Sequence, residues 1–335
     1  MLHFVVVGIL VIVTAILAYF GVNILWPLPL AASAQAAPID WMWNLQMIAI
    51  SFLFALIVVP MLYSLIVFKR KKGDASEGEH IEGNTRLEIT WTILPLIVVL
   101  IFAYLGAGTL ADTRRVDPNA MVVKVTGFQW GWKFDYPEYG ISSNELYLPV
   151  NQQVLLKMES RDVIHSFWVP EFRVKQDLVP GRVTELRITP TIPGDIYKVR
   201  CAELCGTSHA FMENPVIVVD DAGFSAWVAE QQALAAGAAQ TPEGRGQALS
   251  VANGCAACHS IDGSGGIGPT WFRLAGSEVQ LVGGATITAD DAFLAESIKE
   301  PQAKIVAGFE SQQMPAYGFT DEQIADIIAY IKTLR

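Results

Sequence analysis

The chain has 335 residues, an apolar fraction of 52% and a formal net charge of -10 at pH 7. This length allows two or three domains, and the positive mean hydropathy indicates membrane-spanning segments. The negative charge argues against nucleic acid as a partner and suits a basic redox partner. Two motifs use all four cysteines, so none remains for a further structural disulfide.

Three segments without charged residues are long enough to cross a membrane as helices: residues 1–25, 41–68 and 89–111. Pro60 and Pro95 are expected to bend the second and third segments locally. The first segment has an alternative interpretation as a secretory signal peptide, because the small residues AASAQAA follow it. Its long apolar run and the lack of Lys or Arg near its start favour a retained helix.

Four consecutive basic residues at 69–72 directly follow the second segment and begin a loop at 69–88. Because such basic loops stay on the cytoplasmic side, we expect a helical hairpin over 41–111 with this loop inside. The N-terminus is then cytoplasmic, and everything after Ala111 is extracytoplasmic. Glu88 lies at the start of the third segment, where a solvated carboxylate is favoured by the helix dipole.

Short β-branched and apolar runs, broken by Pro, Gly and Asn, fill residues 121–220. Runs such as MVVKVT, QVLLKME and PVIVV predict an antiparallel sandwich or barrel of short strands. The aromatic cluster GFQWGWKFDYPE lies in the same region. We expect Trp132 and Phe134 from this cluster to pack in a core or to anchor the membrane interface.

The stretch CAELCGTSHAFM, residues 201–212, contains two cysteines, a glutamate, a histidine and a methionine. Sulfur and imidazole donors favour copper or zinc over magnesium or calcium, and the thioether of Met212 favours copper. His165 lies far enough upstream to close a metal site from a different strand. On spacing alone, a disulfide between the two cysteines and a structural Cys₂His₂ zinc site remain alternatives.

The motif CAACH begins at Cys255, after a small-residue linker expected at 232–241. C-x-x-C-H is the signature for covalent attachment of a c-type haem. Cys255 and Cys258 would form the thioethers, and His259 would be the proximal iron ligand. A zinc site is disfavoured because no third and fourth thiol are available. A redox dithiol is disfavoured because the site is expected to be extracytoplasmic and a histidine directly follows the second cysteine.

The sixth ligand of this iron follows by elimination. After His259 the chain has no other histidine or cysteine and a single methionine, Met314. His/Met ligation raises the iron potential, which suits a donor to copper. Helices are predicted on both sides of the motif, at 242–252 and 321–334, and Thr320 is the expected N-cap of the second.

The loop at 201–212 resembles the binuclear copper (CuA) loop of cytochrome c oxidase subunit II, C-x-E-x-C-x-x-x-H-x-x-M, with every ligand position filled. The resemblance implies a cupredoxin-like Greek-key β-sandwich at 112–231, with the metal loop between its last two strands. Residues 242–335 resemble an all-α class I cytochrome c domain. The helix at 1–25 is absent from the commonest family layout, and packing against another subunit is its expected role.

The same resemblance assigns the copper ligands residue by residue. Two thiolates would bridge two copper ions, each copper would take one histidine, and a methionine sulfur and a glutamate carbonyl would complete the coordination. These ligands are Cys201, Cys205, His165, His209, Met212 and Glu203. The carboxylate of Glu203 would also reach a magnesium ion at the interface with subunit I.

Three further residues acquire roles from the resemblance, and one position departs from it. Trp130 occupies the position through which electrons enter the copper site, and Gly131 stands where many relatives have a tyrosine. Pro269 resembles the proline whose carbonyl accepts a hydrogen bond from the proximal histidine. The stretch LEITWTILP places Glu88 at the cytoplasmic mouth of a proton path into subunit I.

These features predict subunit II of a haem-copper oxidase of the bacterial plasma membrane, with a fused cytochrome c domain. It would pass electrons from an external donor through its own haem c and the copper pair to subunit I, and fusion raises the local concentration of the haem near its acceptor. Its partners would be subunit I, other oxidase subunits, and an upstream cytochrome, cupredoxin or quinol-oxidizing complex.

Two alternatives belong to other functional classes. A membrane-tethered electron carrier for a different reductase is disfavoured by Glu88 and Trp130. A copper-delivery protein would need neither Met212 nor a fused haem.

Overall fold

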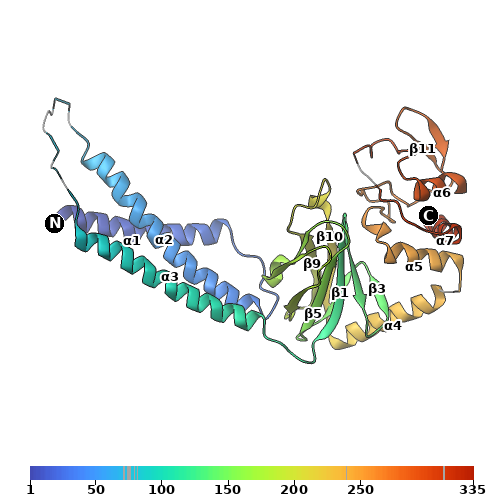
Figure 1. The fold of residues 1–335 in the computed structure, drawn as a ribbon, viewed down its shortest axis with the longest axis horizontal. Coiled ribbons are helices and arrows are strands. Elements are labelled where there is room, and N and C mark those ends of the chain that lie inside the picture. Colours follow the sequence, from blue (N-terminus) through green and yellow to red (C-terminus); the bar gives the residue numbers. More distant parts are fainter. Residues whose placement is uncertain (71, 74–76, 79, 81, 239, 312–313) are drawn as a thin grey trace. The chain divides into compact units, whose positions relative to one another are not determined.

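The computed structural model describes residues 1–335 except 71, 74–76, 79, 81, 239 and 312–313. It separates into two compact units, residues 1–31 with 35–115, and residues 32–34 with 116–335. Figure 1 shows helices in the first unit, and a β-sandwich followed by a helical domain in the second.

The first unit contains the helices α1 (Leu2–Leu25), α2 (Ala36–Val67) and α3 (Thr85–Thr113). Within the described residues, these three are long and apolar enough to cross a membrane, which confirms the three predicted apolar helices. The helix α2 begins before the predicted residue 41, because alanines favour helix and a proline in the first turn breaks no intrahelical hydrogen bond. Parts of the predicted loop 69–88, including Lys71, lie outside the described residues.

The β-domain (residues 121–219) consists of two five-stranded sheets, ordered β3-β2-β1-β5-β8 and β4-β10-β9-β6-β7. The first sheet contains β1 (Met121–Phe128), β2 (Gly131–Tyr136), β3 (Ile141–Ser143), β5 (Val154–Ser160) and β8 (Thr184–Ile188). The second contains β4 (Leu146–Pro149), β6 (His165–Trp168), β7 (Lys175–Leu178), β9 (Gly194–Cys201) and β10 (Glu213–Val219).

The strand pairing corrects the expectation of a purely antiparallel sandwich. β1 pairs in parallel with β5, and β10 pairs in parallel with β4. Each parallel pair joins strands that are separated in the chain by a crossover to the other sheet, and such pairs cannot form from hairpins. Of the two roles expected for Trp132 and Phe134, the structure shows packing in the core between the sheets, since both are fully buried.

Residues 32–34, which we call the N-terminal strap, pack on the β-domain. Ala32 donates its N–H to the Glu171 carbonyl and accepts from the Thr191 N–H, both at 2.9 Å. Ser33 forms an isolated β-bridge with Pro190, and Ala32 is fully buried. A short piece of chain preceding α2 therefore adds to the edge of this domain.

The helix α4 (Asp221–Ala238) follows β10 and packs on the β-domain through aromatic side chains. The rings of Trp227 and Tyr147 are stacked with centroids 4.5 Å apart. Most of the predicted linker 232–241 is therefore helical, because its alanines have high helix propensity. Residue 239 of this linker lies outside the described residues.

The C-terminal domain (residues 242–335) has its own hydrophobic core around the helices α5 (Pro242–Ala252), α6 (Asp291–Lys299) and α7 (Asp321–Thr333). The two predicted helices are confirmed, and Thr320 caps α7 in a capping box with Gln323. α5 and α7 approach closely at Gly246, where an added Cβ would lie 1.9 Å from the Asp326 backbone oxygen. A small hairpin, β11 (Glu278–Gln280) and β12 (Thr286–Thr288), was not expected, since three-residue strands leave little periodic pattern.

Candidate metal and haem sites

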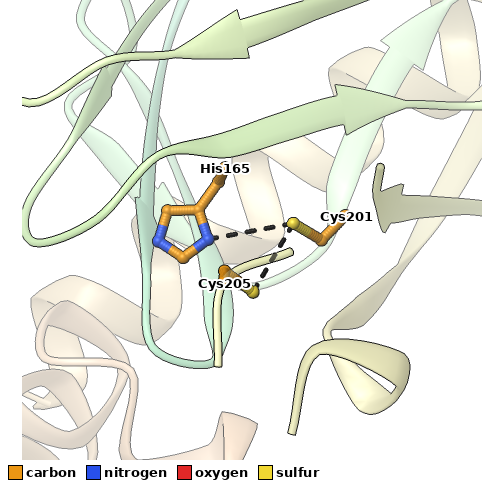
Figure 2. A group of neighbouring side chains, drawn as sticks. All are labelled: His165, Cys201 and Cys205. Atoms are coloured by element: carbon orange, nitrogen blue, oxygen red, sulfur yellow. Dashed lines mark hydrogen bonds between the residues drawn. The ribbon is translucent and has the colours of Figure 1, made fainter. Parts of the chain in front are cut away.

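The metal loop joins the last two strands of the β-domain, as predicted. β9 ends at Cys201 and β10 begins at Glu213, so residues 202–212 form the connection. His165 begins β6, which pairs with β9. Figure 2 shows the side chains of His165, Cys201 and Cys205 turned toward one another. Pairing of these strands brings the distant histidine to the loop.

The donor atoms form a continuous series of contacts with the two sulfurs in the middle. The Cys201 Sγ lies 3.7 Å from the Cys205 Sγ and 3.8 Å from the His165 Nδ1. On the other side, the Cys205 Sγ lies 3.5 Å from the His209 Nδ1 and 3.7 Å from the Met212 Sδ. The structure thus brings together all five predicted side-chain ligands.

The chemistry of this donor set fits copper. Both cysteines are free, and the side chains of His165, Cys205 and Met212 are at most 2% exposed. Soft sulfur donors beside imidazole suit copper better than magnesium or calcium. The carbonyl oxygen of Glu203 lies 3.1 Å from the Cys201 Sγ, while Glu203 itself is an exposed residue.

Hydrogen bonds within the site favour a thiolate. Hydrogen bonds from Cys205 and His165 hold the pKa of the Cys201 thiol below its usual range. The contact with Cys201 raises the pKa of the Cys205 thiol. Burial lowers the pKa of His165, but hydrogen bonds to Asp162 and Cys201 outweigh burial and raise it. Since metals bind the thiolate form, one sulfur is prepared for a cation.

Asp162 is a functional candidate that the sequence reasoning missed. Its Oδ1 lies 2.8 Å from the His165 Nε2, which orients the ring so that Nδ1 faces the sulfurs. Its Oδ2 accepts a 2.7 Å hydrogen bond from the Gln129 backbone N–H. The available signal was an acidic residue three positions before the histidine.

Trp130 is in direct contact with the metal loop. Its Nε1 donates a 3.2 Å hydrogen bond to the Cys205 carbonyl, and the Gln129 Nε2 donates to the same oxygen at 2.7 Å. Trp130 is 9% exposed. The turn between β1 and β2 therefore holds the metal loop through one carbonyl group.

A mainly apolar cavity lies at the C-x-x-C-H motif. Cys255, Cys258, His259 and Met314 all line it, so the four residues predicted to attach and ligate a haem share one space. Burial raises the pKa of Cys255 to about 12 and lowers the pKa of His259. The other lining residues include Ile267, Trp271, Leu274, Phe293, Leu294, Ile298, Ile305, Val306 and Phe309.

The ring of His259 is fixed by its neighbours. Its Nδ1 lies 2.7 Å from the Pro269 carbonyl oxygen, and the ring stacks on Trp271 with centroids 5.1 Å apart. A histidine that donates from one nitrogen to a carbonyl presents the other nitrogen to a metal. These residues fit a haem that would be held by the two cysteines and the histidine.

Glu88 lies at the start of α3, where the structure gives it a local partner. Its Oε1 accepts a 3.4 Å hydrogen bond from the Asn84 N–H, and the Asn84 Oδ1 accepts a 3.2 Å hydrogen bond from the Leu87 N–H. This reciprocal arrangement resembles a capping box. Helix capping thus accounts for an acidic residue here, and a proton-path role stays a prediction.

Comparison with known proteins gives three family matches in chain order. Residues 21–106 match the cytochrome c oxidase subunit II transmembrane domain, residues 141–221 match its periplasmic domain, and residues 244–335 match cytochrome c. The matched domains imply binding of copper and haem c. Together with the three apolar helices, they indicate an integral membrane protein.

Individual relatives carry the same name. The chain is 33% identical over 298 residues to cytochrome c oxidase subunit 2 of Alkalihalophilus pseudofirmus, covering 83% of this chain and 85% of the relative. It is 34% identical over 266 residues to cytochrome c oxidase subunit 2 of Synechocystis sp., covering 65% of this chain and 80% of the relative.

Among solved structures, the periplasmic domain of subunit II of cytochrome oxidase of Bradyrhizobium japonicum is 35% identical, with a TM-score of 0.33. The match covers 35% of this chain and 97% of the solved domain. The order of the matched domains and the length shared with the relatives show that the chain belongs to the cytochrome c oxidase subunit II family and carries a C-terminal cytochrome c domain.

Proposed function

We propose that the chain carries electrons from an external donor, through its own haem c and a dicopper centre, to the oxygen-reducing site of subunit I. The observation that carries this proposal is the position of Trp130. Its indole bonds to the metal loop, and the same residue lines the cavity of the C-x-x-C-H motif. One residue thus touches both candidate cofactor sites.

In the copper site, Cys201 and Cys205 would hold copper through their thiolates, and His165 and His209 would each supply an imidazole. Met212 and the Glu203 carbonyl would be the weak ligands. Copper supplies one-electron redox chemistry when bound. The contribution of the chain is to hold these donors between two strands in a buried loop, so that their geometry changes little on reduction.

In the haem site, Cys255 and Cys258 would hold the macrocycle by thioethers, and His259 and Met314 would ligate the iron. The carbonyl of Pro269 keeps the histidine ring oriented. A methionine ligand and an apolar cavity both raise the potential of a haem. This arrangement suits an electron donor to copper.

The remaining assignments follow the family resemblance. We propose a cytoplasmic N-terminus, an extracytoplasmic location for both cofactor domains, and domain boundaries at 112–231 and 242–335. The exposed Glu203 carboxylate would bind magnesium at the interface with subunit I, since this ion prefers oxygen ligands. Glu88 would lie at a proton path, α1 would pack against another subunit, and the donor would be a cytochrome, a cupredoxin or a quinol-oxidizing complex.

The deciding experiment measures metal and haem content of the purified full-length chain together with its electron paramagnetic resonance spectrum. We expect two coppers with a delocalised mixed-valence signal and one covalently bound haem. In a Cys205→Ser control, the copper signal should disappear while the haem spectrum stays. Bound zinc, a single copper, or an oxidised Cys201/Cys205 pair in a matured sample would contradict the proposal.

A further inference from the structure

The β1–β2 turn of the β-domain packs against residues 254–257 of the C-terminal domain. The two backbones are so close that neither contact glycine could carry a side chain. A Cβ added at Gly131 would lie 2.5 Å from the Cβ of Ala257. A Cβ added at Gly254 would lie 2.0 Å from the Cζ of Phe128. Each turn therefore contributes one glycine at which the other domain reaches the backbone.

A cation–π contact spans the same two domains beside these glycines. The guanidinium carbon of Arg161, which follows β5, lies 5.9 Å from the centre of the Phe128 ring and 5.6 Å from the centre of the Tyr317 ring. Both distances lie within the range in which a cation is attracted to an aromatic face. Tyr317 is itself held within the C-terminal domain, since its hydroxyl donates to the Asn253 carbonyl at 3.2 Å.

The contact covers the tryptophan that touches the metal loop. Trp130 is 9% exposed and Phe128 is 6% exposed, and both line the cavity of the C-x-x-C-H motif. A protein that binds from solution cannot place its own cofactor against an indole that is already covered. The C-terminal domain therefore occupies the surface through which another protein would reach Trp130 and the metal loop.

We propose that Gly131, Gly254 and Arg161 form a docking face reserved for the chain's own C-terminal domain, and that this face closes Trp130 to external donor proteins. The proposal rests on the electron route proposed above and adds to it a partner and a specificity determinant. Gly131 is the determinant, because a side chain at this position removes the space that Ala257 occupies. External donors then reach copper only by way of the haem.

The test uses the full-length chain with copper and haem bound, and varies Gly131. Two quantities are measured: the distance between the oxidised haem iron and the copper pair by pulsed electron paramagnetic resonance, and the rate of electron transfer after photoreduction of the haem. Gly131→Tyr should broaden and lengthen the distance distribution. It should slow electron transfer several-fold, because the tyrosine side chain moves the haem domain away from the metal loop.

A compensating pair makes the test specific to the contact. Gly131→Ala adds the methyl group that meets Ala257, and Ala257→Gly removes the obstructing atom. The double variant should recover most of the distance and rate lost in Gly131→Ala, although the Phe128 ring, 3.1 Å from the added Cβ, must still shift in both. Gly265→Tyr is the matched control, because nothing lies within 4 Å of its added Cβ.

Donor access is tested by mixing with reduced horse heart cytochrome c. In the native chain copper reduction should always follow haem reduction, whereas Gly131→Tyr should add a phase in which copper is reduced directly. A native distance and rate in Gly131→Tyr, or a double variant no better than Gly131→Ala, would overturn the docking proposal. A single short distance without any haem-to-copper transfer in the native chain would instead refute the electron route and leave the docking intact.

Discussion

The indole Nε1 of Trp130 donates its hydrogen bond to the backbone carbonyl of Cys205, 3.2 Å away. This bond connects a residue of the β1–β2 turn directly to the peptide unit of a proposed bridging ligand. The metal loop is therefore held from outside its own sequence, and the tryptophan is held by the loop in return.

Trp130→Phe should slow reduction of the copper centre while its absorption spectrum stays unchanged. Phenylalanine keeps an aromatic ring but loses the hydrogen bond, a loss of about 1 kcal/mol, and Gln129 still holds the same carbonyl. Stopped-flow spectroscopy of copper reduction makes the comparison. Trp168→Phe, on a more exposed tryptophan of β6, is the control, and an equal effect in both variants would count against a special role for Trp130.

Met212→Leu should alter the copper spectrum and leave the haem spectrum intact. The thioether lies 3.7 Å from the Cys205 Sγ, and leucine preserves the volume of this buried side chain at a cost below about 1.5 kcal/mol. Met158→Leu, a buried methionine of β5 outside the donor set, is the matched control. Unchanged copper spectra in Met212→Leu would remove this residue from the ligand set.

Met314→Leu should convert the haem from His/Met ligation to a form without the sulfur ligand, which lowers its reduction potential. The readouts are the absorption of the reduced haem and a potentiometric titration. Ile305→Leu changes another side chain of the same cavity without removing a donor, and should shift neither readout. If Met314→Leu retains the spectrum of a methionine-ligated haem, the elimination that selected it is wrong.

Gly246→Ala should destabilise the C-terminal domain by about 1–3 kcal/mol or more, the usual cost of overpacking. The added methyl meets the backbone of α7, which cannot rotate away as a side chain does. Thermal unfolding followed by haem absorption should shift down by about 4–8 °C per kcal/mol.

Gly237→Ala in α4 is the matched control. Nothing lies within 4 Å of its added Cβ, and alanine is the better helix former by roughly 0.5–1 kcal/mol. This variant should leave the haem transition unchanged. If both variants lower the transition temperature equally, the close approach of α5 and α7 is not the reason for a glycine at position 246.

The sequence was most informative where chemistry is concentrated locally. The ligands in residues 201–212 and at Cys255, Cys258 and His259 lie in short motifs, and the structure places each group at one site. Short β-branched and apolar runs, broken by turn residues, likewise predicted the β-domain. Functional residues next to the motifs were harder to predict. Asp162, for example, differs from any surface aspartate only through its contact with His165.

Long-range relationships could not be predicted in this way. The parallel pairings of β1 with β5 and of β10 with β4 depend on which sheet the chain crosses to, which no local pattern records. Arg161 and Tyr317 carry no signal of their contact, and Gly131 resembles an ordinary turn glycine until Ala257 is placed against it. The helical part of the predicted linker 232–241 was missed because small residues suit linkers and helices equally.

The N-terminal strap bears on how the chain matures. Its small residues, within AASAQAA, are those that a signal peptidase would recognise, yet the backbone of Ala32 is hydrogen bonded on both sides and buried. Proteases cut segments that can leave the folded surface. A protease can therefore cut after α1 only while the β-domain is unfolded. The relative rates of folding and proteolysis then decide whether the first helix stays covalently attached.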